Sequence, residues 1–151
     1  MDRIEAKETN YLYINESQIP GSGKGLFTSI PIYKGEIISI FKGEILGNAE
    51  AKLRAENGKD QYFIIMLDGS IMDSKNTKCF AKYANDADGF IKTQFRKNST
   101  ITLDDDENIC LVATKDLLSG EEVFCSYGKR YWKKHAAQFN KPLPYQSKTG
   151  S

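Results

Sequence analysis

Three short segments of the sequence carry residue types that can bind a polar ligand. The first is the glycine-rich stretch from Gly21 to Phe27, where glycines at alternate positions let backbone N–H and C=O groups approach a ligand that side chains would block. It lacks the glycine and lysine spacing of a phosphate loop, and no buried strand precedes it as in a dinucleotide fingerprint. The segment therefore predicts either a ligand-binding loop or a tight turn.

The second segment runs from Ala81 to Ala87 and places Asn85 and Asp86 directly after an apolar stretch. Side-chain amides and backbone groups there can be directed at a polar ligand, although Asn-Asp also commonly turns a chain. The third segment, Gly120 to Trp132, holds two further aromatic residues within the five positions after Tyr127, and aromatic clusters occur both in sites and in cores. Taken singly, each segment also has a purely structural interpretation.

Taken together, the segments resemble the motifs of the SET-domain protein lysine methyltransferases, in the same order along the chain. The resemblance covers roughly residues 11 to 133 and is closest to the compact, stand-alone members that lack flanking zinc modules. Four pieces carry it: the donor loop in Gly23 to Phe27, the two Gly-Glu pairs in Ile30 to Glu44, the asparagine motif in Lys82 to Ala87, and Gly120-Glu121-Glu122 followed by Ser126-Tyr127.

This resemblance implies a β-clip fold, also called the SET fold, with several short curved sheets, one or two short helices and a C-terminal segment threaded under a loop. It implies a SET domain over residues 11–139, between a charged N-terminal segment (1–10) and a loose C-terminal tail (140–151). It also implies S-adenosylmethionine as the methyl donor, bound on one face of the domain. The substrate lysine would enter from the other face through a narrow channel.

Residue roles follow from the same resemblance. Tyr127 is implied as the catalytic hydroxyl, which would orient the substrate amine and polarise the transferring methyl group. The substrate channel is implied to be lined by Tyr62, Cys125 and Tyr127. The residues implied to hold the donor are Gly23, Lys24, Gly25, Leu26, Tyr62, Lys82, Asn85, Asp86, Tyr127 and Trp132, with Trp132 or Tyr131 either stacking on the adenine or packing in the core.

The sequence departs from the family pattern at several of these positions. Lys82, Asp86 and Ala87 replace an arginine, a histidine and a serine, and Cys125 replaces the aromatic residue that often narrows the lysine channel. Backbone contacts to the donor would survive these changes, whereas the side-chain contributions at residues 82 and 86 are in question. The alternative to an active enzyme is therefore a catalytically weak or inactive SET-like module that binds a peptide or the donor.

The chemistry implied needs no strong general base. A lysine with a pKa near 10.4 is only about one part in a thousand neutral at pH 7, which corresponds to roughly 4 kcal/mol. A dry aromatic channel and the positive charge of the donor both favour the neutral amine. This agrees with a chain whose single histidine, His135, lies outside the motifs.

Hydrophobic patterning predicts the elements that must position these residues. Short strands dominate, and no alternation of strands with helices indicates a parallel sheet, so the pattern predicts a mostly-β domain. We expect a loop at Gly21 to Gly25 and helices at Ala49 to Glu56 and Tyr131 to Phe139. The expected strands are Tyr11 to Asn15, Ile37 to Phe41, Glu44 to Leu46, Tyr62 to Leu67, Ser70 to Met72, Ile101 to Leu103, Ile109 to Ala113 and Val123 to Cys125.

Composition sets the remaining expectations. The 151 residues fit one domain, and 21 Lys and Arg against 20 Asp and Glu give no reason to expect general nucleic-acid or membrane binding. No apolar run approaches the roughly 18 residues that cross a bilayer, and Met1 to Asn10 is too charged for a signal peptide, so we expect an intracellular protein, cytoplasmic or nuclear and not secreted. The expected partner is a protein that bears the target lysine, a histone tail or another, with the enzyme a monomer or homodimer.

No metal is expected. The three cysteines, Cys79, Cys110 and Cys125, are far apart and show neither a disulfide framework nor zinc-ligand spacing. The acidic run from Asp104 to Asn108 lacks the glycine and glutamate of a calcium loop, which favours a solvated hairpin turn.

Overall fold

The computed structural model describes residues 2–66, 68–87 and 93–126, and short strands dominate this part of the chain. The strands are β1 (Asp2–Arg3), β2 (Leu12–Glu16), β3 (Lys24–Thr28), β4 (Glu36–Ile40), β5 (Glu44–Leu46), β6 (Phe63–Ile65), β7 (Ile71–Asp73), β8 (Asn85–Asp86), β9 (Ser99–Leu103), β10 (Ile109–Ala113) and β11 (Glu122–Cys125). The helices are α1 (Glu8–Tyr11), α2 (Asn48–Glu56) and the single 3-10 turn η1 (Ala81–Tyr83). The prediction of a mostly-β fold of several short sheets with one or two short helices is confirmed.

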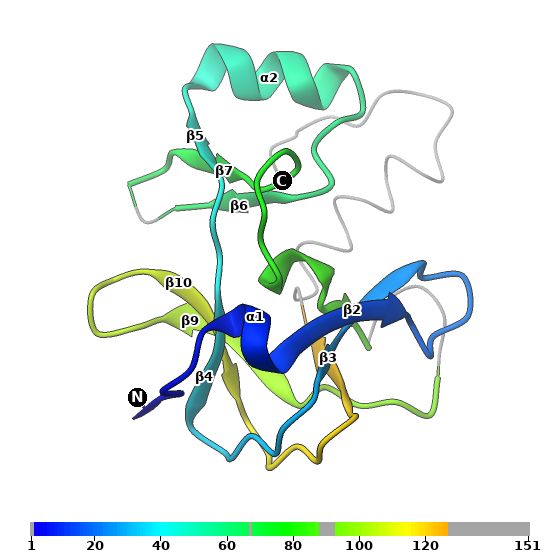
Figure 1. Cartoon of the computed structure of the whole chain (residues 1–151). Helices are drawn as coiled ribbons and strands as arrows, with labels where there is room; N and C mark the ends of the chain where they lie inside the picture. Colours follow the sequence, from blue (N-terminus) through cyan, green and yellow to red (C-terminus); the bar gives the residue numbers. More distant parts are fainter. Residues whose placement is uncertain (1, 67, 88–92, 127–151) are drawn as a thin grey trace.

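The strands form three small sheets, with orders β1-β4-β10-β9, β2-β3-β11-β8 and β5-β7-β6 (Figure 1). The first two sheets share one hydrophobic core. Its large, fully buried side chains include Leu26 of β3, Ile38 of β4, Leu111 of β10 and Val123 of β11, together with Ile32 and Leu117 from the segments before β4 and β11. This core fixes the relative positions of strands that are far apart in the sequence.

The third sheet and α2 form a separate lobe at the top of Figure 1. The Arg54 guanidinium attaches α2 to this sheet, because it bonds Glu50 on α2, Glu44 on β5 and Asp73 on β7 at 2.8, 2.9 and 2.9 Å. The Asp73 side chain is buried and desolvated, and the positive charge of Arg54 compensates for the charge of this carboxylate. Gly58 ends the helix with a φ of 71°, which glycine adopts without strain.

In the second sheet, β11 lies between β3 and β8. β11 pairs antiparallel with β3 through Glu122–Phe27 and Val123–Leu26. Its next two residues, Phe124 and Cys125, pair in parallel with Asn85 and Asp86 of β8. Within the described residues, the ladder between β11 and β3 therefore ends at Leu26, before it reaches Gly25 and Lys24.

Several element predictions were wrong in detail. Lys24 and Gly25 belong to strand β3 and not to a loop, because they pair with Glu16 and Asn15 of β2. Tyr11 ends α1 and does not begin the following strand, and its hydroxyl donates to Ile38 O at 2.8 Å. The strand expected at Tyr62 to Leu67 is limited to β6, Phe63–Ile65.

The N-terminal segment contributes to the fold, since β1 pairs with β4 and the carboxylate of Glu8 accepts bonds from Ser39 Oγ and Ile40 N–H. The helix expected at Tyr131 to Phe139, the tail from residue 140 and the threading of the C-terminal segment lie outside the described residues. None of the helices in the described ranges is long and apolar enough to cross a membrane.

Candidate active site

The glycine-rich segment forms a tight turn that leads into β3. Gly21 and Gly23 have φ values of 79° and 68°, in the left-handed region that favours glycine. Ser17 N–H donates to Gly23 O at 2.7 Å and closes the turn, after which Lys24 and Gly25 pair with Glu16 and Asn15 of β2. The two glycines in the turn are therefore explained by backbone conformation.

Gly25 is explained by packing against Glu122. A Cβ added at residue 25 would overlap Glu122 Oε2 and would lie 3.2 Å from Ser17 Cα. The Glu122 side chain is fully buried, and its carboxylate accepts bonds from Ser17 Oγ at 2.7 Å and Gln18 N–H at 2.8 Å. Glu122, the second glutamate of the Gly-Glu-Glu motif, therefore holds the chain next to the glycine turn in place.

Asn85 connects the second predicted motif to the first. Its amide Nδ2 donates to Lys24 O at 2.9 Å and lies 3.5 Å from Glu122 Oε2. Because the β3–β11 ladder ends at Leu26, the amide of Asn85 bonds β3 where the sheet pairing has stopped. The glycine turn, the asparagine and the Gly-Glu-Glu strand thus meet where the pairing of β3 with β11 ends, a place that we call the opening in the second sheet.

Lys82 and Tyr62, two further residues predicted to hold the donor, lie next to each other. The Lys82 ammonium donates to Ser74 O, Lys75 O and Thr77 O at 2.9, 3.2 and 3.1 Å, so all three of its protons have acceptors. Its Nζ also lies 5.3 Å from the ring centres of Tyr62 and Tyr83. Lys82 therefore fixes the loop at residues 74–77 against η1 and holds its positive charge beside two aromatic rings.

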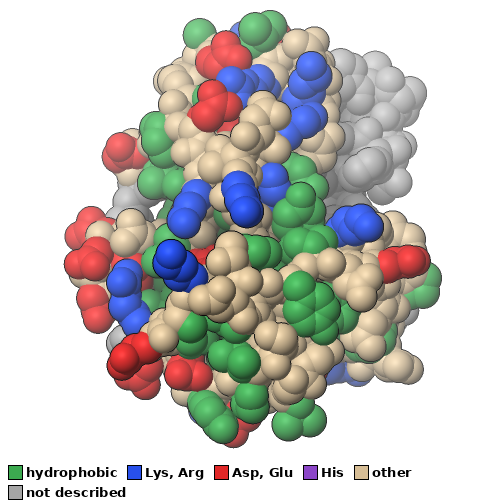
Figure 2. Space-filling model, in the orientation of Figure 1, with side chains coloured by type: hydrophobic (Ala, Val, Ile, Leu, Met, Phe, Trp, Pro, Cys, Tyr) green, Lys and Arg blue, Asp and Glu red, His purple; other side chains and the backbone are tan. Residues whose placement is uncertain are grey.

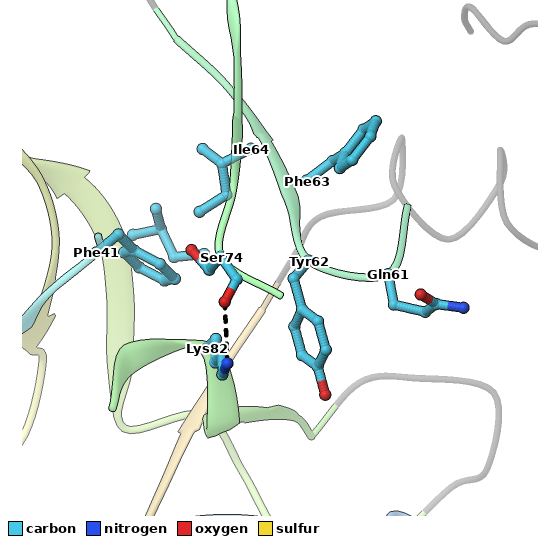
Figure 3. A pocket seen from close by; sticks show the side chains of 8 residues that line it. Phe41, Gln61, Tyr62, Phe63, Ile64, Ser74 and Lys82 are labelled. Atoms are coloured by element: carbon cyan, nitrogen blue, oxygen red, sulfur yellow. Dashed lines mark hydrogen bonds between the residues drawn. The ribbon is translucent and has the colours of Figure 1, made fainter. Parts of the chain in front are cut away.

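Tyr62 and Lys82 border a cavity of about 180 Å³ (Figure 3). Its walls are mostly apolar, with Phe41, Ile64 and Ile101 among them. Burial, with a smaller contribution from Tyr83, raises the pKa of the Tyr62 hydroxyl, so this phenol stays neutral at physiological pH. The cavity is a suitable environment for an uncharged aliphatic chain that ends in a polar group.

Cys125 and Asp86 are neighbours across the β8–β11 ladder and are both buried. The Cys125 thiol donates weakly to Ala84 O at 3.8 Å, and burial, helped by the charge of Asp86, raises its pKa well above the ordinary value. Cys125 packs in the main core and is absent from the described lining of the Tyr62 cavity. Its place in the substrate channel stays a prediction.

Of the residues predicted to hold the donor, the structure brings Gly23, Lys24, Gly25 and Asn85 together at the opening, while Leu26 lies in the core behind them. Tyr127 and Trp132 lie outside the described residues. Ser17 and Gln18 were missed by the sequence reasoning, because a serine and a glutamine before a glycine turn give no signal of a partner more than a hundred positions away. Among the described residues, no group of three or more His, Cys, Asp or Glu could hold a metal ion.

The sequence was compared with models of known protein families and with known proteins. The family model described as SET domain matches residues 23–128. The histone-lysine N-methyltransferase EZH2 of Chaetomium thermophilum is 27% identical over 129 residues, which cover 78% of this chain but 8% of that protein.

Solved structures agree with this match. An active polycomb repressive complex 2 in the basal state has a TM-score of 0.66 at 27% identity, over 79% of this chain and 15% of the matched chain. Chaetomium thermophilum polycomb repressive complex 2 bound to GSK126 has a TM-score of 0.66 at 25% identity, over 78% and 16%. The chain thus spans a small part of the length of these relatives.

Proposed function

Because the chain belongs to the SET-domain family, we propose that it is a protein-lysine N-methyltransferase that takes its methyl group from S-adenosylmethionine. SET-domain methyltransferases generally use this donor. The observation that carries the proposal is the hydrogen bond from Asn85 Nδ2 to Lys24 O, which joins two of the predicted donor-binding motifs at the opening in the sheet.

The residues at this opening fit the donor. The backbone of Lys24 and Gly25 is not paired with β11, and no heavy atom lies within 4 Å of the position that a Cβ of Gly23 would occupy. Bound there, the donor would supply a methyl group on a positively charged sulfonium. The buried carboxylate of Glu122 behind the turn has no cationic partner among the described residues, so its negative charge favours a cation nearby.

On the substrate side, we assign Tyr62 to the wall of the lysine channel and Tyr127 to the hydroxyl that orients the amine. The apolar cavity beside Tyr62 disfavours a charged ammonium by desolvation. The fixed positive charge of Lys82 acts in the same direction, because it repels a second cation near the Tyr62 ring. Together these effects help to offset the roughly 4 kcal/mol needed to deprotonate a free lysine at pH 7.

The arrangement of Lys82 favours an active enzyme over the inactive alternative. Lysine at this position retains the positive charge of arginine, and its ammonium donates three hydrogen bonds to the loop at residues 74–77. Asp86 still pairs with β11 through its backbone. The substitutions at 82 and 86 therefore leave the backbone framework of the opening intact.

The substrate is a protein lysine, and the similarity to a histone-lysine methyltransferase supports a histone and a nuclear site of action. The matched structures are multisubunit complexes, which supports partner subunits as an alternative to a lone monomer or a homodimer. Ribosomal and cytoplasmic proteins remain the competing substrates.

The test is methyl incorporation from labelled S-adenosylmethionine into purified histones and into cell lysate. We expect incorporation by the wild type and by Tyr33→Phe, an exposed control, and loss of incorporation in Tyr127→Phe with donor binding retained in calorimetry. Donor binding without transfer to any substrate would favour the inactive module. Absence of donor binding would overturn the proposal.

A further inference from the structure

A basic groove lies beside α1, apart from the opening where Asn85 meets Lys24. It has a volume of about 480 Å³, with the side chains of Lys7, Lys42 and Lys78 around it and Ile40, Cys79 and Phe80 also in its lining. Lys and Arg side chains gather over the middle of this face of the molecule (Figure 2). The lining of the groove combines three lysines with apolar side chains.

The positive charge of the groove is available to a partner. Lys7, Lys42 and Lys78 are exposed, and their ammonium groups make no hydrogen bond or ion pair with the described residues. The carboxylate in the lining, Glu8, is already engaged, because Ser39 Oγ donates to Oε1 at 2.6 Å and Ile40 N–H donates to Oε2 at 3.0 Å. Among the described residues of the lining there are thus three lysines and one carboxylate, and that carboxylate already accepts bonds from the protein itself.

We propose that this groove binds an acidic protein segment with an apolar side chain at its centre. Carboxylates of such a segment complement the three lysines, and an apolar side chain between them can cover Ile40 and Phe80. A nucleic-acid backbone satisfies the charge but leaves the apolar surface in water. The chain's own residues 127–151 contain no Asp or Glu and cannot supply the acidic segment.

The groove shares its wall with the Tyr62 cavity. Lys42 N–H donates to Cys79 Sγ at 3.4 Å, and Ser74 Oγ donates to Lys42 O at 2.6 Å, so the segment 40–42 and the loop 74–80 are bonded to one another. Phe41 and Ser74 line the cavity, whereas Ile40, Lys42 and Lys78 line the groove. An occupant of the groove therefore contacts the same loop whose carbonyls hold Lys82, although its binding does not depend on methyl transfer.

The experiment measures fluorescence anisotropy of the full chain with a labelled twelve-residue peptide in which glutamates flank one phenylalanine. We expect saturable binding that weakens as salt is added. The double variant Lys42→Glu with Lys78→Glu should weaken binding by about tenfold or more, whereas Lys59→Glu with Lys115→Glu, at exposed lysines outside the lining, should leave it within about twofold. The pair Lys42→Ala with Lys78→Ala repeats the test if the charge reversal prevents folding.

Four results would overturn the proposal. These are no binding by the wild type, equal loss in both double variants, equal binding of a peptide with glutamine in place of glutamate, and equal binding of a peptide with serine in place of phenylalanine. Single-stranded DNA of twelve thymidines is the remaining probe. Tighter binding of this DNA than of the peptide, lost in the Lys42 and Lys78 variants, would assign the groove to nucleic acid and would also reject the acidic segment.

Discussion

The α-carbon of Gly25 packs directly against the buried carboxylate of Glu122 and leaves no room for a side chain. The same carboxylate accepts bonds from Ser17 Oγ and Gln18 N–H, so it holds the chain before the glycine turn and packs against Gly25 after it. The shape of the proposed donor loop is thus set by a residue of β11. This contact leads to the first prediction.

Replacement of Gly25 by alanine should destabilise the fold by about 1–3 kcal/mol, because the new Cβ overlaps Glu122 Oε2 and Ser17 must move. The control is Gly47→Ala, where φ is −75° and no heavy atom lies within 4 Å of the added Cβ. It should change the free energy of unfolding by less than about 0.5 kcal/mol. Urea denaturation measures both, and equal stability of the two variants would show that the packing at residue 25 is looser than described.

Asn85→Ala should weaken donor binding by about five- to tenfold, because it removes the amide that bonds Lys24 O at the opening. Asn76→Ala is a matched control, since Asn76 is exposed and its side chain has no hydrogen-bond partner among the described residues. Calorimetry with S-adenosylmethionine compares the two. If both variants bind the donor as the wild type does, residue 85 does not help to form the site.

The parts of the fold that the sequence predicted well are held by local interactions. The hairpin of β9 and β10 was predicted because its turn residues and apolar runs are adjacent, and α2 because its residues favour a helix and Asn57-Gly58 ends it. β3 was missed, because its glycines favour a loop and its strand conformation is stabilised by β2 and by β11 near the other end of the chain. β1 and β8, of two residues each, are too short for any pattern.

For the site, the order of the motifs predicted which segments meet, but the atoms that join them were not predictable. The bonds of Glu122 to Ser17 and Gln18 depend on tertiary packing, and no periodicity relates these residues. The three carbonyls that accept from the Lys82 ammonium were likewise not predictable, and the expected contact of Lys82 with the donor stays a prediction.

Asp104 should make the fold sensitive to acid. Its carboxylate accepts N–H bonds from Asn108 and Asp106, and these bonds hold its pKa below the ordinary value. A carboxylate with a lowered pKa stabilises the fold above about pH 4, and this stabilisation is lost as the pH falls further. Asp104→Asn should therefore lower the melting temperature at pH 7 and have much less effect near pH 3.

The control for this prediction is Asp106→Asn, because the Asp106 side chain is exposed and makes no bond to a described residue. Thermal unfolding at a series of pH values compares the two variants. A melting-temperature difference between Asp104→Asn and the wild type that is the same at pH 3 and pH 7 would contradict the assigned role of the carboxylate.

Cys125 is proposed to line the lysine channel, at a position where the family often has an aromatic residue. Its smaller side chain should leave the channel wide enough for di- and trimethylated products. Mass spectrometry of a methylated substrate peptide measures this for the wild type and for Cys125→Ala. Cys110→Ala is the control, because Cys110 is equally buried but packs with Ile37 and Val112 away from β8. Product limited to monomethyllysine in both the wild type and Cys125→Ala would refute the steric argument.

The position of β11 between β3 and β8 also has a consequence for biosynthesis. Ser17 and Glu122 are separated by 105 positions. Strands β2 and β3 therefore emerge from the ribosome long before β11, which joins β3 to β8. Until β11 is made, the edges of β3 and β8 are unpaired and can associate with other chains. The nascent protein therefore depends on completing translation through residue 125 before the proposed donor site can form, and a chain that stops earlier should be a substrate for chaperones or proteases.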